Sequence, residues 1–173
     1  MTKIKLLLVD DHEIVRAGLR MLFMAEPGVE IVGEASNGAE ALAAVARCRP
    51  DIVLMDAAMP DMNGMEATRR IKEAFPDVAV LALTMHEDER YFFAMLDAGA
   101  SGYVPKRAAP DELMSAIQTV SQGDVFIHPS LARLLVNDFL QRSAAGRGDS
   151  LDELTARERE VLVLIADGFS NKE

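Results

Sequence analysis

Residues 52–64 read Ile-Val-Leu-Met-Asp-Ala-Ala-Met-Pro-Asp-Met-Asn-Gly, and this stretch decides the fold class. Four apolar residues, Ile52 to Met55, run without interruption into the carboxylate of Asp56. A proline and a glycine then turn the chain into residues 64–74, where apolar side chains recur at helical spacing. A short, continuous apolar run is typical of a strand that is buried on both faces of a parallel sheet. The stretch therefore predicts a buried strand, a sharp turn and a helix.

The same strand–helix unit recurs on both sides of this stretch. The predicted strands cover residues 4–9, 29–32, 52–55, 78–83 and 101–104. The predicted helices cover residues 13–24, 39–47, 64–74, 88–97 and 110–121. Strand–helix–strand units align their strands in parallel and place the helices on the faces of the sheet. We therefore predict an α/β fold with a doubly wound, five-stranded parallel sheet.

The chain changes character after residue 124. Residues 129–141 have leucines and a phenylalanine at helical spacing and predict one amphipathic helix. Residues 143–150 are small, polar and rich in glycine, which is typical of a flexible linker.

Two capping boxes follow this linker. Residues 155–158 and 170–173 each begin with Thr or Ser and end with Glu, the pattern found at helix starts. The second capping box predicts the start of a helix at the last residues of the sequence, so we expect the last unit to be incomplete. The predicted division is a folded domain, a linker with one helix and a partial helical unit, at residues 1–124, 125–150 and 151–173.

Composition and charge narrow the class of protein. Hydrophobic residues make up 50% of the chain and charged residues 27%, which is typical of globular domains. The formal net charge of −10 makes the chain a poor candidate for binding nucleic acid by charge alone. It favours a bound cation or a basic partner surface instead.

The single cysteine and the N-terminus indicate the compartment. Cys48 has no second cysteine to pair with, which fits a reducing environment. The apolar run at residues 6–9 stops at two aspartates, far short of a membrane span or a signal peptide core. We expect a cytoplasmic protein without a membrane partner.

Chemically active residues follow four of the five predicted strands. In an open α/β sheet, ligands bind at the carboxyl ends of the strands. The residues that follow these ends are Asp10, Asp11, Asp56, Thr84 and Lys106. Each one alone is explained by a helix cap, a loop hydroxyl or a surface lysine. The topology, however, brings all of them to one edge of the sheet.

Three carboxylates in one place point to a divalent cation. Crowded carboxylates repel one another unless a cation neutralises them, and Mg²⁺ takes one or two carboxylates, waters and a phosphate oxygen. With the charge neutralised, a carboxylate can attack phosphorus and form an aspartyl phosphate. Asp56 is the predicted nucleophile because it ends the central of the three strands. Lys106 can neutralise the negative charge of the phosphoryl group, and Thr84 can donate a hydrogen bond to a phosphoryl oxygen.

The chain resembles the receiver domain of two-component response regulators over residues 4 to about 123. The pieces that carry this resemblance match in order and spacing. They are Leu-Val-Asp-Asp-His (8–12), Met-Asp-Ala-Ala-Met-Pro-Asp-Met-Asn-Gly (55–64), Leu-Thr-Met-His (83–86) and Gly-Tyr-Val-Pro-Lys (102–106). The resemblance implies a flavodoxin-like fold with strand order 2-1-3-4-5.

The resemblance also implies the chemistry of the site. A sensor histidine kinase would transfer a phosphoryl group to Asp56. Mg²⁺ would be held by Asp11, Asp56 and the backbone carbonyl of Ala58, with Asp10 acting through water. As in the family, the domain would catalyse only its own phosphotransfer and dephosphorylation, and would not be an enzyme in the ordinary sense.

The resemblance to receiver domains also implies a conformational switch. Thr84 would turn towards the phosphoryl group, and Tyr103 would move inward behind it. Tyr103 taken alone is a strand residue that packs its ring on a neighbouring helix. The presence of Thr84 and Lys106 beside it favours the switch.

Some positions depart from the family pattern. Ala57 replaces a bulkier apolar residue, Asn63 stands where Asp is frequent, and Arg107 follows the lysine where proline is common. The changes at positions 57 and 63 remove no reacting group, and with Arg107 the cis Lys-Pro bond usual in the family is absent. Ala58 and His86 resemble positions that tune the rate of dephosphorylation.

Residues 154–173 resemble the start of a LuxR-type helix-turn-helix. Together with the receiver, they resemble a NarL/FixJ-type transcription regulator, which would bind DNA in its full-length form and dimerise on phosphorylation. In that family the recognition helix comes later in the chain. We therefore expect these 173 residues not to bind an operator specifically.

Two other functions compete with this interpretation. A Mg²⁺-dependent phosphohydrolase of the haloacid dehalogenase type also uses an aspartate nucleophile, but it carries an Asp-x-Asp pair on its first strand and a cap domain. Here Asp10 and Asp11 are adjacent, and no cap insertion is evident. A stand-alone receiver that binds a protein partner is the second alternative, and the helix-turn-helix resemblance argues against it.

Overall fold

The apolar runs form the strands of one parallel sheet. The computed structural model describes residues 2–85, 89–144, 160, 161 and 163. In this part of the chain the sheet has the order β2-β1-β3-β4-β5-β6. Its strands are β1 (Ile4–Val9), β2 (Val29–Ala35), β3 (Ile52–Asp56), β4 (Ala79–Thr84), β5 (Gly102–Pro105) and β6 (Phe126–Ile127).

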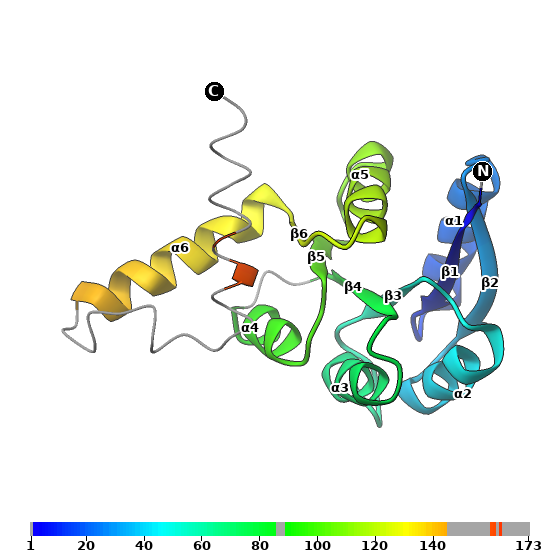
Figure 1. Cartoon of the computed structure of the whole chain (residues 1–173), viewed down its shortest axis with the longest axis horizontal. Coiled ribbons are helices and arrows are strands. Elements are labelled where there is room, and N and C mark those ends of the chain that lie inside the picture. The colour runs from blue at the N-terminus through cyan, green and yellow to red at the C-terminus, as the bar shows by residue number, and fades with distance from the viewer. Residues whose placement is uncertain (1, 86–88, 145–159, 162, 164–173) are drawn as a thin grey trace.

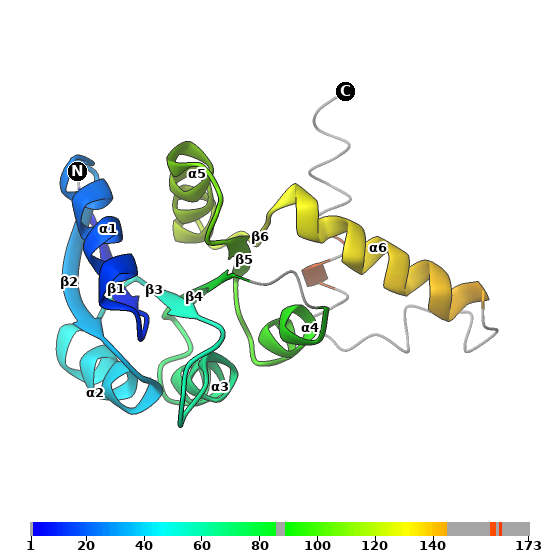
Figure 2. The same ribbon diagram turned by 180° about the vertical axis from the view of Figure 1, so that it is seen from behind.

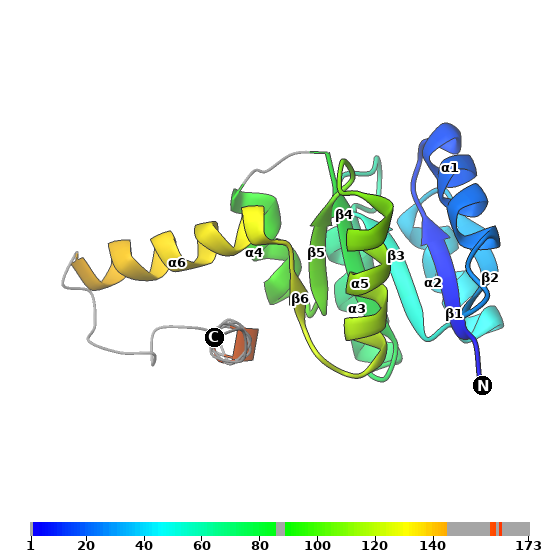
Figure 3. The same cartoon turned by 90° about the horizontal axis from the view of Figure 1, so that it is seen from above.

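Helices cover both faces of the sheet. Helices α1 (Glu13–Met24) and α5 (Pro110–Ser121) lie on one face. Helices α2 (Gly38–Cys48), α3 (Gly64–Ala74) and α4 (Glu89–Asp97) lie on the other (Figure 1). The strands lie between these two layers in Figures 1 and 2, and Figure 3 looks onto the face that carries α1 and α5. The molecule is therefore a three-layer sandwich around its sheet.

Alternate residues of each strand enter opposite core layers. Leu6 and Leu8 of β1 pack with the side chains of α1 and α5, whereas Leu7 and Val9 pack with those of α2, α3 and α4. Successive side chains of a strand point to opposite faces, so a strand must be apolar throughout to be buried on both. Burial of each such side chain contributes about 1.5–3 kcal/mol before the entropy of ordering is subtracted.

Helix α3 begins directly after the loop that follows β3. Its N-cap, Asn63, accepts a hydrogen bond from the backbone N–H of Glu66 over 2.9 Å. A side-chain oxygen at this position satisfies one of the free N–H groups of the first turn and contributes about 1 kcal/mol. The cap therefore stabilises the first turn of α3, where the loop that begins at Asp56 ends.

The predicted strand order 2-1-3-4-5 is confirmed, and β6 extends it by one strand. Phe126 and Ile127 pair with Gly102 and Tyr103 of β5. We predicted five strands, because a two-residue strand is too short to show any periodicity. Pairing depends on Gly102, since a Cβ there would lie 2.7 Å from the carbonyl oxygen of Phe126. The chain can approach β5 only where no side chain intervenes.

Helix α6 (Pro129–Ala144) follows β6 and projects away from the sheet (Figures 2 and 3). It confirms the helix predicted over residues 129–141 and is three residues longer. Leu131 and Leu135 are buried in the same core layer as α4, and Val161 joins them. Residues 160, 161 and 163 are helical. The remainder of the predicted linker and helix-turn-helix, residues 145–159, 162 and 164–173, lies outside the described residues.

Among the described residues, no helix is both long enough and apolar enough to cross a bilayer.

Candidate functional site

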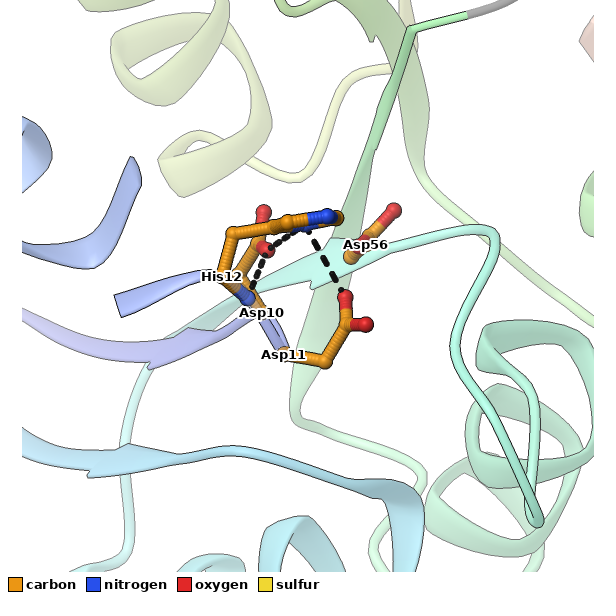
Figure 4. A group of neighbouring side chains, drawn as sticks. All are labelled: Asp10, Asp11, His12 and Asp56. Carbon is orange, nitrogen blue, oxygen red and sulfur yellow. Dashed lines mark hydrogen bonds and ion pairs between the residues drawn. The ribbon is translucent and has the colours of Figure 1, made fainter. Parts of the chain in front are cut away.

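The carboxyl ends of four adjacent strands bring the predicted site residues together. Asp10 and Asp11 follow β1, Asp56 ends β3, Thr84 ends β4, and Lys106 follows β5. Strand β1 pairs with β3, β3 with β4, and β4 with β5, all in parallel. The side chains of Asp10, Asp11 and Asp56 converge at this edge of the sheet (Figure 4).

Lys106 connects two of the carboxylates. Its ammonium nitrogen lies 2.5 Å from Oδ2 of Asp10 and 3.1 Å from Oδ2 of Asp56. All three side chains are almost fully buried, with 6% of Lys106 and 2–3% of the two aspartates exposed to solvent. A buried lysine is rare unless it is paired, so a surface lysine is the wrong interpretation of this residue. The pair with Asp10 joins the ends of β1 and β5, which lie on either side of β3 and β4, and the pair with Asp56 joins the ends of β3 and β5.

Backbone hydrogen bonds hold the strand ends in register around the site. The N–H of Lys106 donates to the carbonyl of Thr84 over 2.7 Å, and the N–H of Ala57 donates to the carbonyl of Leu83 over 3.0 Å. The N–H of Ala58 donates to Oδ1 of Asp56 over 3.1 Å. One oxygen of the Asp56 carboxylate is thus oriented by the backbone, and the other faces Lys106.

Burial changes the acidity of Asp56. Removal from water raises its pKa from 3.8 to about 6, and the negative charge of Asp10 acts in the same direction. The Lys106 ammonium and the hydrogen bond from the Ala58 amide oppose this effect without cancelling it. At neutral pH the carboxylate is charged, and burial of this charge lowers the free energy of unfolding.

This effect of burial predicts how stability depends on pH. The folded protein binds the Asp56 proton more tightly than the unfolded chain does, so the free energy of unfolding falls as pH rises from about 4 to about 6. The loss attributable to this group between about pH 4.5 and about pH 7.5 is about 2 kcal/mol. Urea denaturation of the wild type and Asp56→Asn, without divalent cations, measures it.

The variant Asp56→Asn has no titrating group at this position. Its stability relative to the wild type should therefore increase over the same pH range by about 2 kcal/mol. If the free energy of unfolding depends on pH in the same way in both proteins, burial does not raise the pKa of Asp56.

The site has the donor atoms that a divalent cation requires. Among the described residues, Asp10 Oδ2, Asp11 Oδ1 and Asp56 Oδ2 are buried and have no aligned hydrogen-bond donor, although charged or polar nitrogens lie near them. One ligand atom from each of these residues and from His12 falls within 4.8 Å of the others. Hard carboxylate oxygens in this arrangement suit Mg²⁺. The residues present therefore fit a cation of this class.

Thr84 and Tyr103 are both buried, and their proposed movements stay predictions. Thr84 is 3% exposed at the end of β4, and the ring of Tyr103 is fully buried. The Tyr103 ring meets that of Phe92 in α4 edge-on, with the ring centroids 5.2 Å apart. Packing on a neighbouring helix, the plainer of our two interpretations of Tyr103, is thus what this structure contains. His86 lies outside the described residues.

Two contacts of the site were not predicted from the sequence. The imidazole Nδ1 of His12 lies 3.0 Å from Asp10 Oδ1 and 3.1 Å from Asp11 Oδ1 (Figure 4). Arg16 donates to the backbone carbonyl of Asp10 over 2.5 Å. The position of His12 directly after two site aspartates was the available signal. Nothing in the local pattern distinguishes Arg16 from the other charged residues of α1.

Gly64 is tightly enclosed by the loop after β3. A Cβ at this position would lie 2.1 Å from the backbone oxygen of Asp56 and 2.9 Å from the Cα of Ala57. The start of α3 therefore packs directly on the backbone that carries the Asp56 carboxylate. No residue with a side chain fits there unless this backbone moves.

Comparisons with known proteins give one consistent result. The family model described as "Response regulator receiver domain" matches residues 6–118. The chain is 41% identical to the oxygen regulatory protein NreC of Staphylococcus carnosus (strain TM300), over 98% of this chain and 80% of that protein.

Solved structures agree with these sequence matches. A LuxR-family two-component response regulator from Aurantimonas sp. SI85-9A1 superimposes with a TM-score of 0.76 at 37% identity, over 80% of this chain and 99% of that one. The response regulator RcsB in a complex with DNA superimposes with a TM-score of 0.72 at 27% identity, over 97% of this chain and 79% of that one.

Proposed function

The chain belongs to the two-component response regulators of the NarL/FixJ type, and from this membership we propose that Asp56 accepts a phosphoryl group from the phosphohistidine of a sensor kinase. Response regulators of this type are phosphorylated and regulate transcription. The proposal concerns which residues of this chain carry out the transfer, and how.

The observation that carries the proposal is the position of Lys106 between Asp10 and Asp56. Its ammonium lies within 3.1 Å of an oxygen of each carboxylate, at the one sheet edge where the other site residues gather. Paired with two buried carboxylates, Lys106 is held with its charge directly beside the predicted acceptor oxygen. Beside a phosphorylated Asp56, the same ammonium would compensate the added negative charge.

In the proposed reaction, an oxygen of the ionised Asp56 carboxylate attacks the phosphorus of the donor. A new P–O bond forms to Asp56, and the P–N bond of the phosphohistidine breaks with its electron pair going to the imidazole nitrogen. Phosphoryl transfer depends mainly on positioning and on neutralising charge. The Ala58 amide orients the carboxylate through its 3.1 Å hydrogen bond. Lys106 and the hydroxyl of Thr84 would bind the transferred oxygens.

Receiver domains bind Mg²⁺, and the donor set described above fits this ion. We assign Asp11, Asp56 and the backbone carbonyl of Ala58 as its ligands, with Asp10 acting through water. When bound, Mg²⁺ supplies positive charge against the carboxylates and the phosphoryl oxygens. Asp10 and Asp11 hold that charge beside Asp56, where repulsion between carboxylates would otherwise oppose the transfer.

The output of the proposed switch is control of DNA binding. RcsB, a relative in fold, has been solved in a complex with DNA. We assign residues 151–173 to the start of a LuxR-type helix-turn-helix, joined to the receiver through β6 and α6, and propose that the full-length protein dimerises on phosphorylation. Strand β6 pairs directly with β5, the strand of Tyr103, so movement of Tyr103 would reach α6 through this pairing.

The test is the intact mass of the protein after incubation with acetyl phosphate. With Mg²⁺ we expect a gain of one phosphoryl group per chain, and with EDTA a rate at least about 100-fold lower, since about 3 kcal/mol of charge stabilisation is lost. A phosphorylated sensor kinase is the second donor to try. Absence of any gain with either donor would contradict the proposal and indicate a receiver that works by binding alone.

A further inference from the structure

His12 occupies a position in the fold that its local role does not explain. It is the N-cap residue of α1, but its side chain makes no capping hydrogen bond. Serine, threonine, aspartate and asparagine are the residues favoured there, because their side-chain oxygens accept a hydrogen bond from the first turn. The imidazole of His12 turns instead towards the carboxylates of the site (Figure 4).

The ring nitrogen Nδ1 lies between two carboxylate oxygens. It is 3.0 Å from Asp10 Oδ1 and 3.1 Å from Asp11 Oδ1, and Asp10 Oδ1 already accepts a hydrogen bond from the backbone N–H of His12 over 2.8 Å. One N–H cannot serve both carboxylates well. The ring nitrogen and one oxygen each from Asp10, Asp11 and Asp56 lie within 4.8 Å of one another, a separation that a single metal ion can span.

We propose that His12 contributes Nδ1 as a nitrogen ligand to the divalent cation of this site and thereby shifts its metal preference from Mg²⁺ towards transition-metal ions such as Co²⁺, Ni²⁺ and Zn²⁺. The inference rests on the proposed function, because it concerns the same cation. Mg²⁺ binds carboxylates, carbonyls and water, whereas imidazole favours the later transition metals. A site with carboxylates and one imidazole is thus less selective for Mg²⁺ than one with oxygen ligands alone.

The exposure of His12 is compatible with this role. Its side chain is 61% exposed, whereas that of Asp10 is 2% exposed and that of Asp11 26%. Ligation through Nδ1 places the ring proton on Nε2, and in a ring this exposed the Nε2–H can donate a hydrogen bond to water. The ring stands at the rim of the site, so a Mg²⁺ ion could bind the oxygens and leave it free. His12→Gln should consequently affect the two classes of metal differently.

The experiment compares Mg²⁺ and Co²⁺ binding to untagged protein at about pH 7.5 by isothermal titration calorimetry. A polyhistidine tag would bind Co²⁺, and a tryptophan quenching assay is not applicable because the chain has no tryptophan. For His12→Gln we expect Co²⁺ affinity to fall about tenfold or more, with Mg²⁺ affinity unchanged within about twofold. His128→Gln is the matched control, since that histidine contacts Glu112 and Ser130 instead of the site.

A direct readout separates ligation from a structural effect. The Co²⁺ form of the wild type should show hyperfine-shifted signals from the carbon-bound ring protons of one imidazole, absent in His12→Gln and present in His128→Gln. If both metals bind and His12→Gln changes neither affinity nor spectrum, the inference is wrong and the proposed function stands. If the wild type binds neither metal, the metal site of the proposed function fails, and the inference fails with it.

Discussion

Asp56→Asn will take up no phosphoryl group from acetyl phosphate or from a sensor kinase. The amide is nearly the same size as the carboxylate, so it can keep the contact with the Ala58 amide, but its oxygen is not an anionic nucleophile. The expected effect is complete loss of the mass gain that the wild type shows with Mg²⁺.

The matched control for this variant is Asp61→Asn. Asp61 lies in the same loop and is exposed, and its backbone φ of 64° is one that asparagine also tolerates. Its uptake of the phosphoryl group should equal that of the wild type. Phosphorylation of Asp56→Asn at the wild-type rate would mean that another residue is the acceptor, and fragmentation of the modified protein would then identify it.

Gly64→Ala will destabilise the protein by about 3 kcal/mol or more, although it adds a single methyl group. The new Cβ would lie 2.1 Å from the backbone oxygen of Asp56, and this oxygen is not the end of a flexible side chain that could move aside. Either α3 or the end of β3 has to shift. Urea denaturation measures the loss, and slower phosphorylation of the folded fraction should accompany it, because the Asp56 backbone is displaced.

Gly18→Ala is the control for the substitution itself. Gly18 lies inside α1, and a Cβ there would meet nothing within 4 Å. Alanine costs less backbone entropy than glycine in a helix, so this variant should be more stable than the wild type by about 0.5–1 kcal/mol. Equal effects of the two substitutions would contradict the close packing of α3 on the loop after β3.

The strand–helix alternation was readable because burial on both faces leaves a local pattern. Four uninterrupted apolar residues before Asp56 predicted β3 correctly, and similar runs predicted β1 and β4 to within a residue of their observed ends. Strand β2 was predicted too short, at residues 29–32, because Gly33 and Glu34 interrupt its apolar run. It is an edge strand, and edge strands need not be apolar on both faces.

Other features left no local signal. Strand β6 has two residues, and its pairing depends on the missing side chain of Gly102, about 24 residues earlier in the chain. The pattern around Gly64 predicted a turn, but not that the turn packs on the Asp56 carbonyl. Such close approaches depend on two backbone segments that meet in the fold, and neither segment has a sequence pattern that predicts the contact.

By itself the sequence determined the fold class, the edge of the sheet where the site lies, and the residue types gathered there. These follow from periodicity and from the position of polar residues at strand ends, both of which are local. The tertiary structure alone decided that Lys106 is buried between Asp10 and Asp56, that Asp56 has a raised pKa, and that His12 turns into the site. Ion pairing and desolvation depend on distances between segments that are far apart in the chain, so they are defined only once the sheet has assembled.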